Sequence, residues 1–136
     1  MEELRQFLGH YHAFFAHFPI ALIVVGAVVR LWWALRPSEP SWHGSQVMLG
    51  LGAASTFLTI LSGLSRVHFK MELHGTLALH RNSAIGLGVW SVLHLMLILF
   101  RPNWAQTRVG AAVWALIGAA LALTTGYFGG EVADAA

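Results

Sequence analysis

Residues 46–65 read QVMLGLGAASTFLTILSGLS, a run of twenty positions without a charged side chain. A helix needs about 20 apolar residues to cross the hydrocarbon core of a bilayer, which is roughly 30 Å thick. The same length and character recur at 13–35, 79–100 and 109–130, and the last of these is also uncharged. We therefore expect an all-α fold, an integral membrane four-helix up-down bundle that forms one domain over residues 1–136.

The composition excludes an ordinary water-soluble domain. Of the 136 residues 57% are hydrophobic and 10% are charged, whereas soluble domains carry about 25% charged residues. The formal net charge of +2 is too small to indicate nucleic acid as a partner. The absence of cysteine excludes disulfides, thiolate-ligated iron–sulfur clusters and covalently attached haem. The lipid bilayer is the partner that this composition predicts.

Polar segments separate the predicted spans. Two of them, RPSEPSWHGS (36–45) and RPNWAQTR (101–108), are predicted turns, and each opens with Arg-Pro, which ends a helix. Arg30 lies near the end of the first span, where its long side chain can snorkel toward the interface. Residues 1–15 are expected to form a short interfacial helix, because their apolar positions fall on one face.

Four spans would place both termini on one side of the membrane, together with the loop between the second and third spans. Six of the eight histidines fall on that side, namely His10, His12, His17, His68, His74 and His80. Lysine and arginine divide four against four between the sides, so the positive-inside rule gives no orientation. The termini carry four acidic residues and the Arg-Pro turns one. From this we expect the Arg-Pro turns on the cytoplasmic side of the membrane and both termini on the outer side.

Two histidines share one face of the third predicted span. His80 and His94 are fourteen residues apart, which brings a helix to within roughly 40° of whole turns and about 21 Å along its axis. Ionisable residues at membrane depth are costly and indicate function. Because about 21 Å is too far for one metal ion, each histidine is expected to serve a different depth.

A haem group would account for such histidines, because an uncharged imidazole then becomes an axial ligand of the iron. The site needs two histidines at equal depth on neighbouring helices. His17 opens the first span and His80 opens the third, which runs in the same direction. We therefore expect His17 and His80 to bind haem b near the outer surface, with Arg81 beside the haem propionates. A backbone carbonyl or Ser83 can orient a ligating imidazole.

Other interpretations of the histidines stay open. His94 lies deeper, and His43 at the start of the second span is its predicted partner for a second haem; otherwise His94 only forms a hydrogen bond within the bundle. The outer histidines can instead bind copper or zinc, or lie at the interfaces of a structural or assembly subunit in a larger membrane complex. No nucleophile or zinc-protease pattern is present, so an electron-transfer protein or subunit is expected more than a stand-alone enzyme.

Three motifs resemble a known bacterial family. HFPIAL (17–22), the His-Arg pair at 80–81 and TGYFGGE (125–131) are similar to motifs of the small four-span membrane proteins grouped as domain of unknown function 2231. By position the resemblance carries over His17, His80 and Arg81, together with Gly126, Gly129 and Gly130. The chain departs from the family at its end, where GGEVADAA replaces a tail that contains a further histidine.

The resemblance implies a redox function. Members of that family occur fused to Rieske or cytochrome c domains, and the group is similar to two-haem, cytochrome b-like proteins. We accordingly expect a b-type haem protein of the bacterial inner membrane, with periplasmic termini, that carries out transmembrane or interfacial electron transfer. A quinone or a periplasmic redox protein would be its partner, and it would act as a homo-oligomer or within a larger membrane complex.

Overall fold

The protein is described from a computed structural model, which covers residues 1–66 and 74–135. Within these residues the ordered elements are helices: α1 (Glu2–His10), α2 (His12–Leu35), α3 (Glu39–Arg66), α4 (Gly75–Phe100), α5 (Asn103–Gln106) and α6 (Arg108–Asp134). The four long helices α2, α3, α4 and α6 are each long and apolar enough to cross a membrane. The all-α class and the number of apolar helices of spanning length are therefore confirmed for the described part of the chain.

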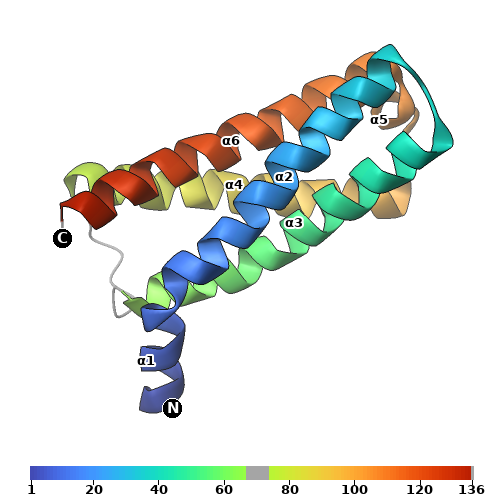
Figure 1. Cartoon of the computed structure of the whole chain (residues 1–136). Coiled ribbons are helices and arrows are strands. Elements are labelled where there is room, and N and C mark those ends of the chain that lie inside the picture. The colour runs from blue at the N-terminus through green and yellow to red at the C-terminus, as the bar shows by residue number, and fades with distance from the viewer. Residues whose placement is uncertain (67–73, 136) are drawn as a thin grey trace.

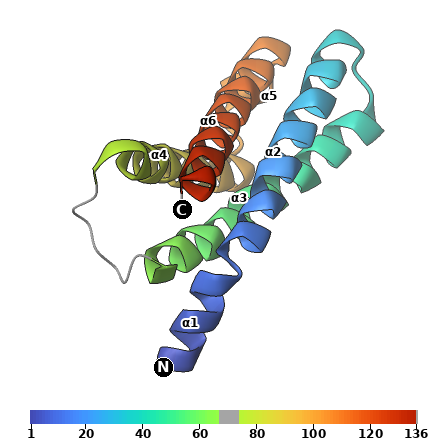
Figure 2. The ribbon, with the colours of Figure 1, turned by 60° about the vertical axis from the view of Figure 1, so that its left-hand side comes forward.

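The four long helices pack as a ring of neighbours. Helix α2 packs against α3 and α6, and α4 packs against the same two helices, so α2 and α4 lie diagonally across the bundle. Figure 2 shows α3 and α6 between them. Successive long helices run in alternate directions, so both termini lie at the end opposite the α2–α3 turn and α5 (Figure 1). Helix α1 projects beyond the bundle at the end where the termini lie.

Helix α3 begins at Glu39, whereas the second span was predicted to start at residue 46. The Ser38 hydroxyl accepts a hydrogen bond from the Ser41 backbone N–H at 3.3 Å, as an N-cap residue does. Pro40 falls in the first turn, where a missing N–H leaves no helical hydrogen bond unmade. The second half of the segment 36–45 is therefore helical, because a cap and a tolerated proline extend the helix beyond its apolar stretch.

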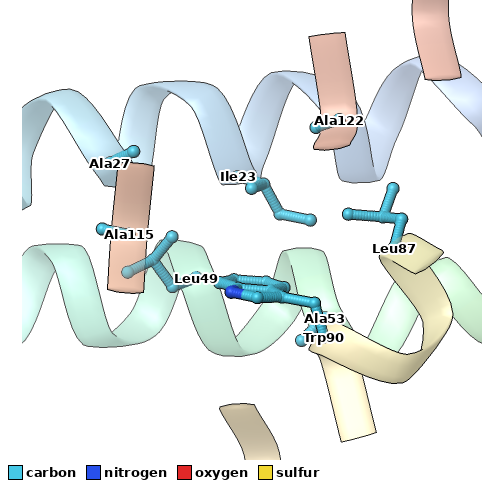
Figure 3. Close-up of a cluster of buried hydrophobic side chains, with 8 residues drawn as sticks. All are labelled: Ile23, Ala27, Leu49, Ala53, Leu87, Trp90, Ala115 and Ala122. Carbon is cyan, nitrogen blue, oxygen red and sulfur yellow. The ribbon is translucent and has the colours of Figure 1, made fainter. Parts of the chain in front are cut away.

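Small residues let the helices approach closely around a buried core (Figure 3). The bulky members of this core are Ile23, Leu49, Leu87 and Trp90, and alanines of α2, α3 and α6 fill the remaining space. A Cβ added at Gly52 would stand 2.6 Å from the Ile23 side chain, and one at Gly118 would stand 2.3 Å from the Trp90 ring. Glycine at these two positions therefore permits the close packing of the helices.

The exterior of the bundle is apolar as well. In an apolar stretch of 18 residues in each long helix, only 28–33% of the residues are buried inside the bundle. Large apolar side chains are exposed on all four helices, among them Val25, Val28, Leu51, Phe57, Val89, Leu93, Val113 and Leu116. A helix that is apolar all round is typical of a membrane span or of the centre of a large protein.

Candidate functional site

Two histidines from diagonally opposite helices meet near the end of the bundle that carries the termini. The imidazole rings of His12 on α2 and His80 on α4 have centroids 6.2 Å apart and planes inclined by 73°. Because α3 and α6 separate α2 from α4 over most of their length, this contact reaches across the interior of the bundle. The fold thus brings together two imidazoles that lie 68 residues apart in the chain (80 − 12).

Each ring is oriented by a hydrogen bond to one of the intervening helices. His12 Nδ1 lies 2.8 Å from Ser62 Oγ on α3. Ser62 gives its own hydrogen to the Thr59 carbonyl at 2.8 Å, so it accepts from His12 Nδ1–H. His80 Nδ1–H donates to the Thr125 carbonyl on α6 at 3.0 Å. Both Nε2 atoms therefore carry a lone pair, since a neutral imidazole has one N–H.

Two glycines make room for these rings. A Cβ at Gly63 on α3 would stand 2.9 Å from His12 Cε1, and one at Gly129 on α6 would stand 3.1 Å from His80 Cε1. All four long helices therefore contribute to one level of the bundle. We call this level the histidine layer, and it consists of His12, Ser62, Gly63, His80, Thr125 and Gly129.

The histidine layer offers two imidazoles, with ring centroids 6.2 Å apart, as the nitrogen ligands that a metal would need. In the described residues no three His, Asp or Glu side chains group closely enough to hold a metal ion. Zinc needs three or four protein ligands, whereas haem iron takes its remaining ligands from the porphyrin.

The structure places His17 differently from the predicted pairing with His80. The His17 side chain is exposed, and its Nδ1 forms a hydrogen bond with the Ala13 carbonyl of its own helix. His17 follows His12 by five positions, which is about 140° around a helix, so only one of them can face α4. Among the described residues it is His12 that contacts His80. The sequence gives the angle between the two histidines around the helix. It does not give the direction in which α4 lies, so it could not show which histidine faces α4.

The groups expected to support the site also differ in part. Of the two orienting groups predicted, a backbone carbonyl or Ser83, the structure has a carbonyl: that of Thr125 accepts from the His80 imidazole. Ser83 instead donates to the His80 carbonyl at 2.9 Å. The Arg81 guanidinium forms hydrogen bonds with Asn82 Oδ1 at 2.9 and 3.1 Å. His68, which was predicted on this side of the bundle, lies outside the described residues.

A second group of polar residues surrounds a cavity at the opposite end of the bundle. The cavity has a volume of about 130 Å³ and is lined by residues of α3, α4 and α6, by α5 and by Arg30 of α2. His43 and His94, the predicted partners for a second haem, both line it. We call it the arginine cavity, because Arg30 and Arg101 also form part of its wall.

Arg30 does not snorkel as the sequence led us to expect. Its side chain is 3% exposed, and its Nε donates to Ser45 Oγ at 2.7 Å while Nη2 donates to Gln46 Oε1 at 2.6 Å. The guanidinium also lies 4.1 Å from the centre of the Trp42 ring, in cation–π geometry. Acceptors on α3 therefore hold Arg30 inside the bundle, because they replace the water that snorkelling would have reached.

The tautomer of His94 follows from its neighbour on α6. Trp114 Nε1–H donates to His94 Nδ1 at 3.0 Å, so the imidazole hydrogen resides on Nε2. The ring is stacked on Trp90, with centroids 4.9 Å apart and planes inclined by 5°. In this arrangement Nε2 is a donor and does not offer the lone pair that iron requires. The geometry favours the alternative that His94 forms a hydrogen bond within the bundle over its prediction as a second haem ligand.

Comparison of the chain with protein-family models, with curated proteins and with solved structures gives no match. The resemblance of the motifs at 17–22, 80–81 and 125–131 therefore stays a prediction.

Proposed function

We propose that the chain is a multi-pass membrane protein whose four long helices each cross the bilayer. The proposal is supported by large apolar side chains that are exposed on all four long helices. In water such a surface would cost about 25 cal/mol for each Å² of apolar area left unburied. Lipid removes that cost, because the hydrocarbon of the bilayer is as apolar as the side chains that contact it.

Within this membrane bundle we propose a haem b site in which His12 and His80 would hold the iron. The observation that carries the proposal is the pair of imidazoles 6.2 Å apart, each with its Nδ1–H engaged and its Nε2 lone pair available. When bound, haem b would supply one-electron transfer. The proposal keeps the predicted ligand His80 and replaces His17 with His12.

The other residues of the histidine layer would position the ligands. Ser62 and the Thr125 carbonyl fix the tautomer and the ring orientation of His12 and His80, which is how outer hydrogen bonds commonly support ligating histidines. Gly63 and Gly129 leave the space that the rings occupy. Arg81 directly follows His80 on the same helix, and it is the cation that we propose to lie beside the haem propionates. The electron partner we propose is a quinone or a periplasmic redox protein.

The test is a reduced-minus-oxidised absorption spectrum of the purified protein, with the haem-to-protein ratio measured on the same sample. We expect a b-type band in the wild-type protein and its loss in both His12→Ala and His80→Ala. His17→Ala is the matched control, because it removes an exposed imidazole from the same helix as His12, and it should retain the band. Loss of haem in His17→Ala with retention in His12→Ala would restore the original pairing and overturn this one.

Copper is the second candidate for the histidine layer, because imidazole also binds copper well. Elemental analysis of the same sample distinguishes the two: stoichiometric copper without a haem band would assign the layer to copper. Protein with neither metal nor haem, even after addition of hemin, would favour the structural or assembly subunit.

A further inference from the structure

The arginine cavity contains a buried cation for which the described part of the chain supplies no counterion. Arg30 is 3% exposed, and its hydrogen-bond acceptors, Ser45 and Gln46, are both neutral. The ion pair found among the described residues joins Arg5 to Glu2, both of which belong to α1. No Asp or Glu lines the cavity, whereas Arg101 lines it too. A buried charge is costly unless an opposite charge accompanies it.

A second, independent observation concerns His94, which also lines the cavity. Its side chain is 3% exposed, and its Nε2 has no hydrogen-bond partner among the described residues. Trp114 occupies Nδ1 as a donor, so Nε2 carries the hydrogen. A buried N–H without an acceptor costs about 1–3 kcal/mol. The walls of the cavity therefore contain a buried cation and a buried donor without an acceptor in the described part of the chain, and both favour a ligand with negatively charged acceptor oxygens.

The size and the remaining walls limit what such a ligand can be. A cavity of about 150 Å³ holds a molecule the size of benzene, and this one measures about 130 Å³. The lining also includes apolar groups, namely Leu97, Ile98 and the indole of Trp114. A ligand of about six non-hydrogen atoms that has an oxyanion and a short hydrocarbon would match both the polar and the apolar lining residues.

We propose that the arginine cavity binds a small organic carboxylate, with the carboxylate between Arg30 and His94 Nε2–H and the hydrocarbon against Leu97 and Ile98. A guanidinium and a carboxylate form strong charge-assisted hydrogen bonds. The carboxylate would also accept from Nε2–H, which satisfies the buried donor. This site lies at the opposite end of the bundle from the histidine layer and is independent of the haem proposal.

The proposal can be tested with butyrate, which has six non-hydrogen atoms, and with butyramide, which has the same shape and no charge. Binding to the detergent-solubilised protein is followed by tryptophan fluorescence, because Trp42 and Trp114 line the cavity. We expect saturable binding of butyrate and affinity for butyramide at least about tenfold lower, since the charge-assisted bonds are lost. Equal binding of the two, or no saturable butyrate signal, would overturn the proposal. Because this comparison uses the wild-type protein, it does not depend on the folding of a variant.

Variants then locate the site. Arg30→Gln should abolish the preference for butyrate over butyramide, and Arg101→Gln should weaken it. Arg108→Gln is the matched control, because Arg108 is exposed and does not line the cavity; a loss of preference in that variant equal to the loss in Arg30→Gln would refute the location. Octanoate identifies the source of the ligand: tighter binding than butyrate assigns the site to a membrane-borne fatty acid, and weaker binding assigns it to a water-soluble acid.

Discussion

Replacement of Gly118 by alanine should destabilise the bundle through the ring of Trp90. Gly118 lies on α6 and is buried. A Cβ at this position would stand 2.3 Å from Trp90 Cζ2, 2.5 Å from Cε2 and 2.7 Å from Cη2. Carbon atoms in contact are normally about 3.5–4.0 Å apart. The contact involves the body of a buried indole, so the ring itself must move by roughly 1 Å.

The size of the effect follows from what the Trp90 ring contacts. Overpacking of this kind typically costs about 1–3 kcal/mol. A shifted ring would also lose the hydrogen bond from Trp90 Nε1–H to the Trp114 carbonyl, which measures 3.1 Å and contributes about 0.5–1.5 kcal/mol. In the opposite direction, alanine stabilises a helix by about 0.5–1 kcal/mol relative to glycine. We therefore expect Gly118→Ala to lower the free energy of unfolding by about 2 kcal/mol.

The assay is far-UV circular dichroism of the detergent-solubilised protein during titration with a denaturing detergent. Gly130→Ala is the matched control, because Gly130 lies on the same helix and a Cβ there would meet nothing within 4 Å. This control should be neutral or slightly stabilising. Trp90→Phe should recover part of the loss in the Gly118→Ala background, since the smaller ring leaves room for the new methyl group. If Gly118→Ala and Gly130→Ala unfold at the same concentration of denaturing detergent, the packing argument is wrong.

Three further outcomes are expected. Ser62→Ala removes the acceptor that orients His12. If the wild-type protein binds haem, this variant should have about 10–100-fold lower affinity in a hemin titration. Unchanged affinity would contradict this role of Ser62. Thr107→Ala removes the N-cap hydroxyl of α6, which accepts a hydrogen bond from the Gly110 N–H at 3.1 Å. The free energy of unfolding should fall by about 0.5–2 kcal/mol in the denaturation assay. An unchanged free energy would show that the cap contributes nothing. Finally, the expressed protein should stay with the membrane pellet after alkaline carbonate washing, and release into the supernatant would refute membrane insertion.

Hydropathy alone was enough to predict the existence of the four long helices, for a simple physical reason. A helix satisfies its own backbone hydrogen bonds, so a long apolar stretch such as 46–65 can be assigned without knowledge of its neighbours. The Arg-Pro pairs likewise marked where α2 and α4 end, because proline acts on the residue directly before it. The start of α3 was missed because a polar cap and a proline within the first turn extended the helix beyond its apolar part.

The site residues needed the tertiary structure, because contacts depend on the rotation and depth of each helix. The sequence contained both His12 and His17 near the start of one helix, and only the packing of α2 decides which of them faces His80. In the same way, neutral acceptors on α3 keep Arg30 inside the bundle, and an indole on α6 determines which nitrogen of His94 carries its hydrogen. Apolar length is a property of one segment, whereas the partner of a polar side chain is a property of two or more helices packed in a particular register.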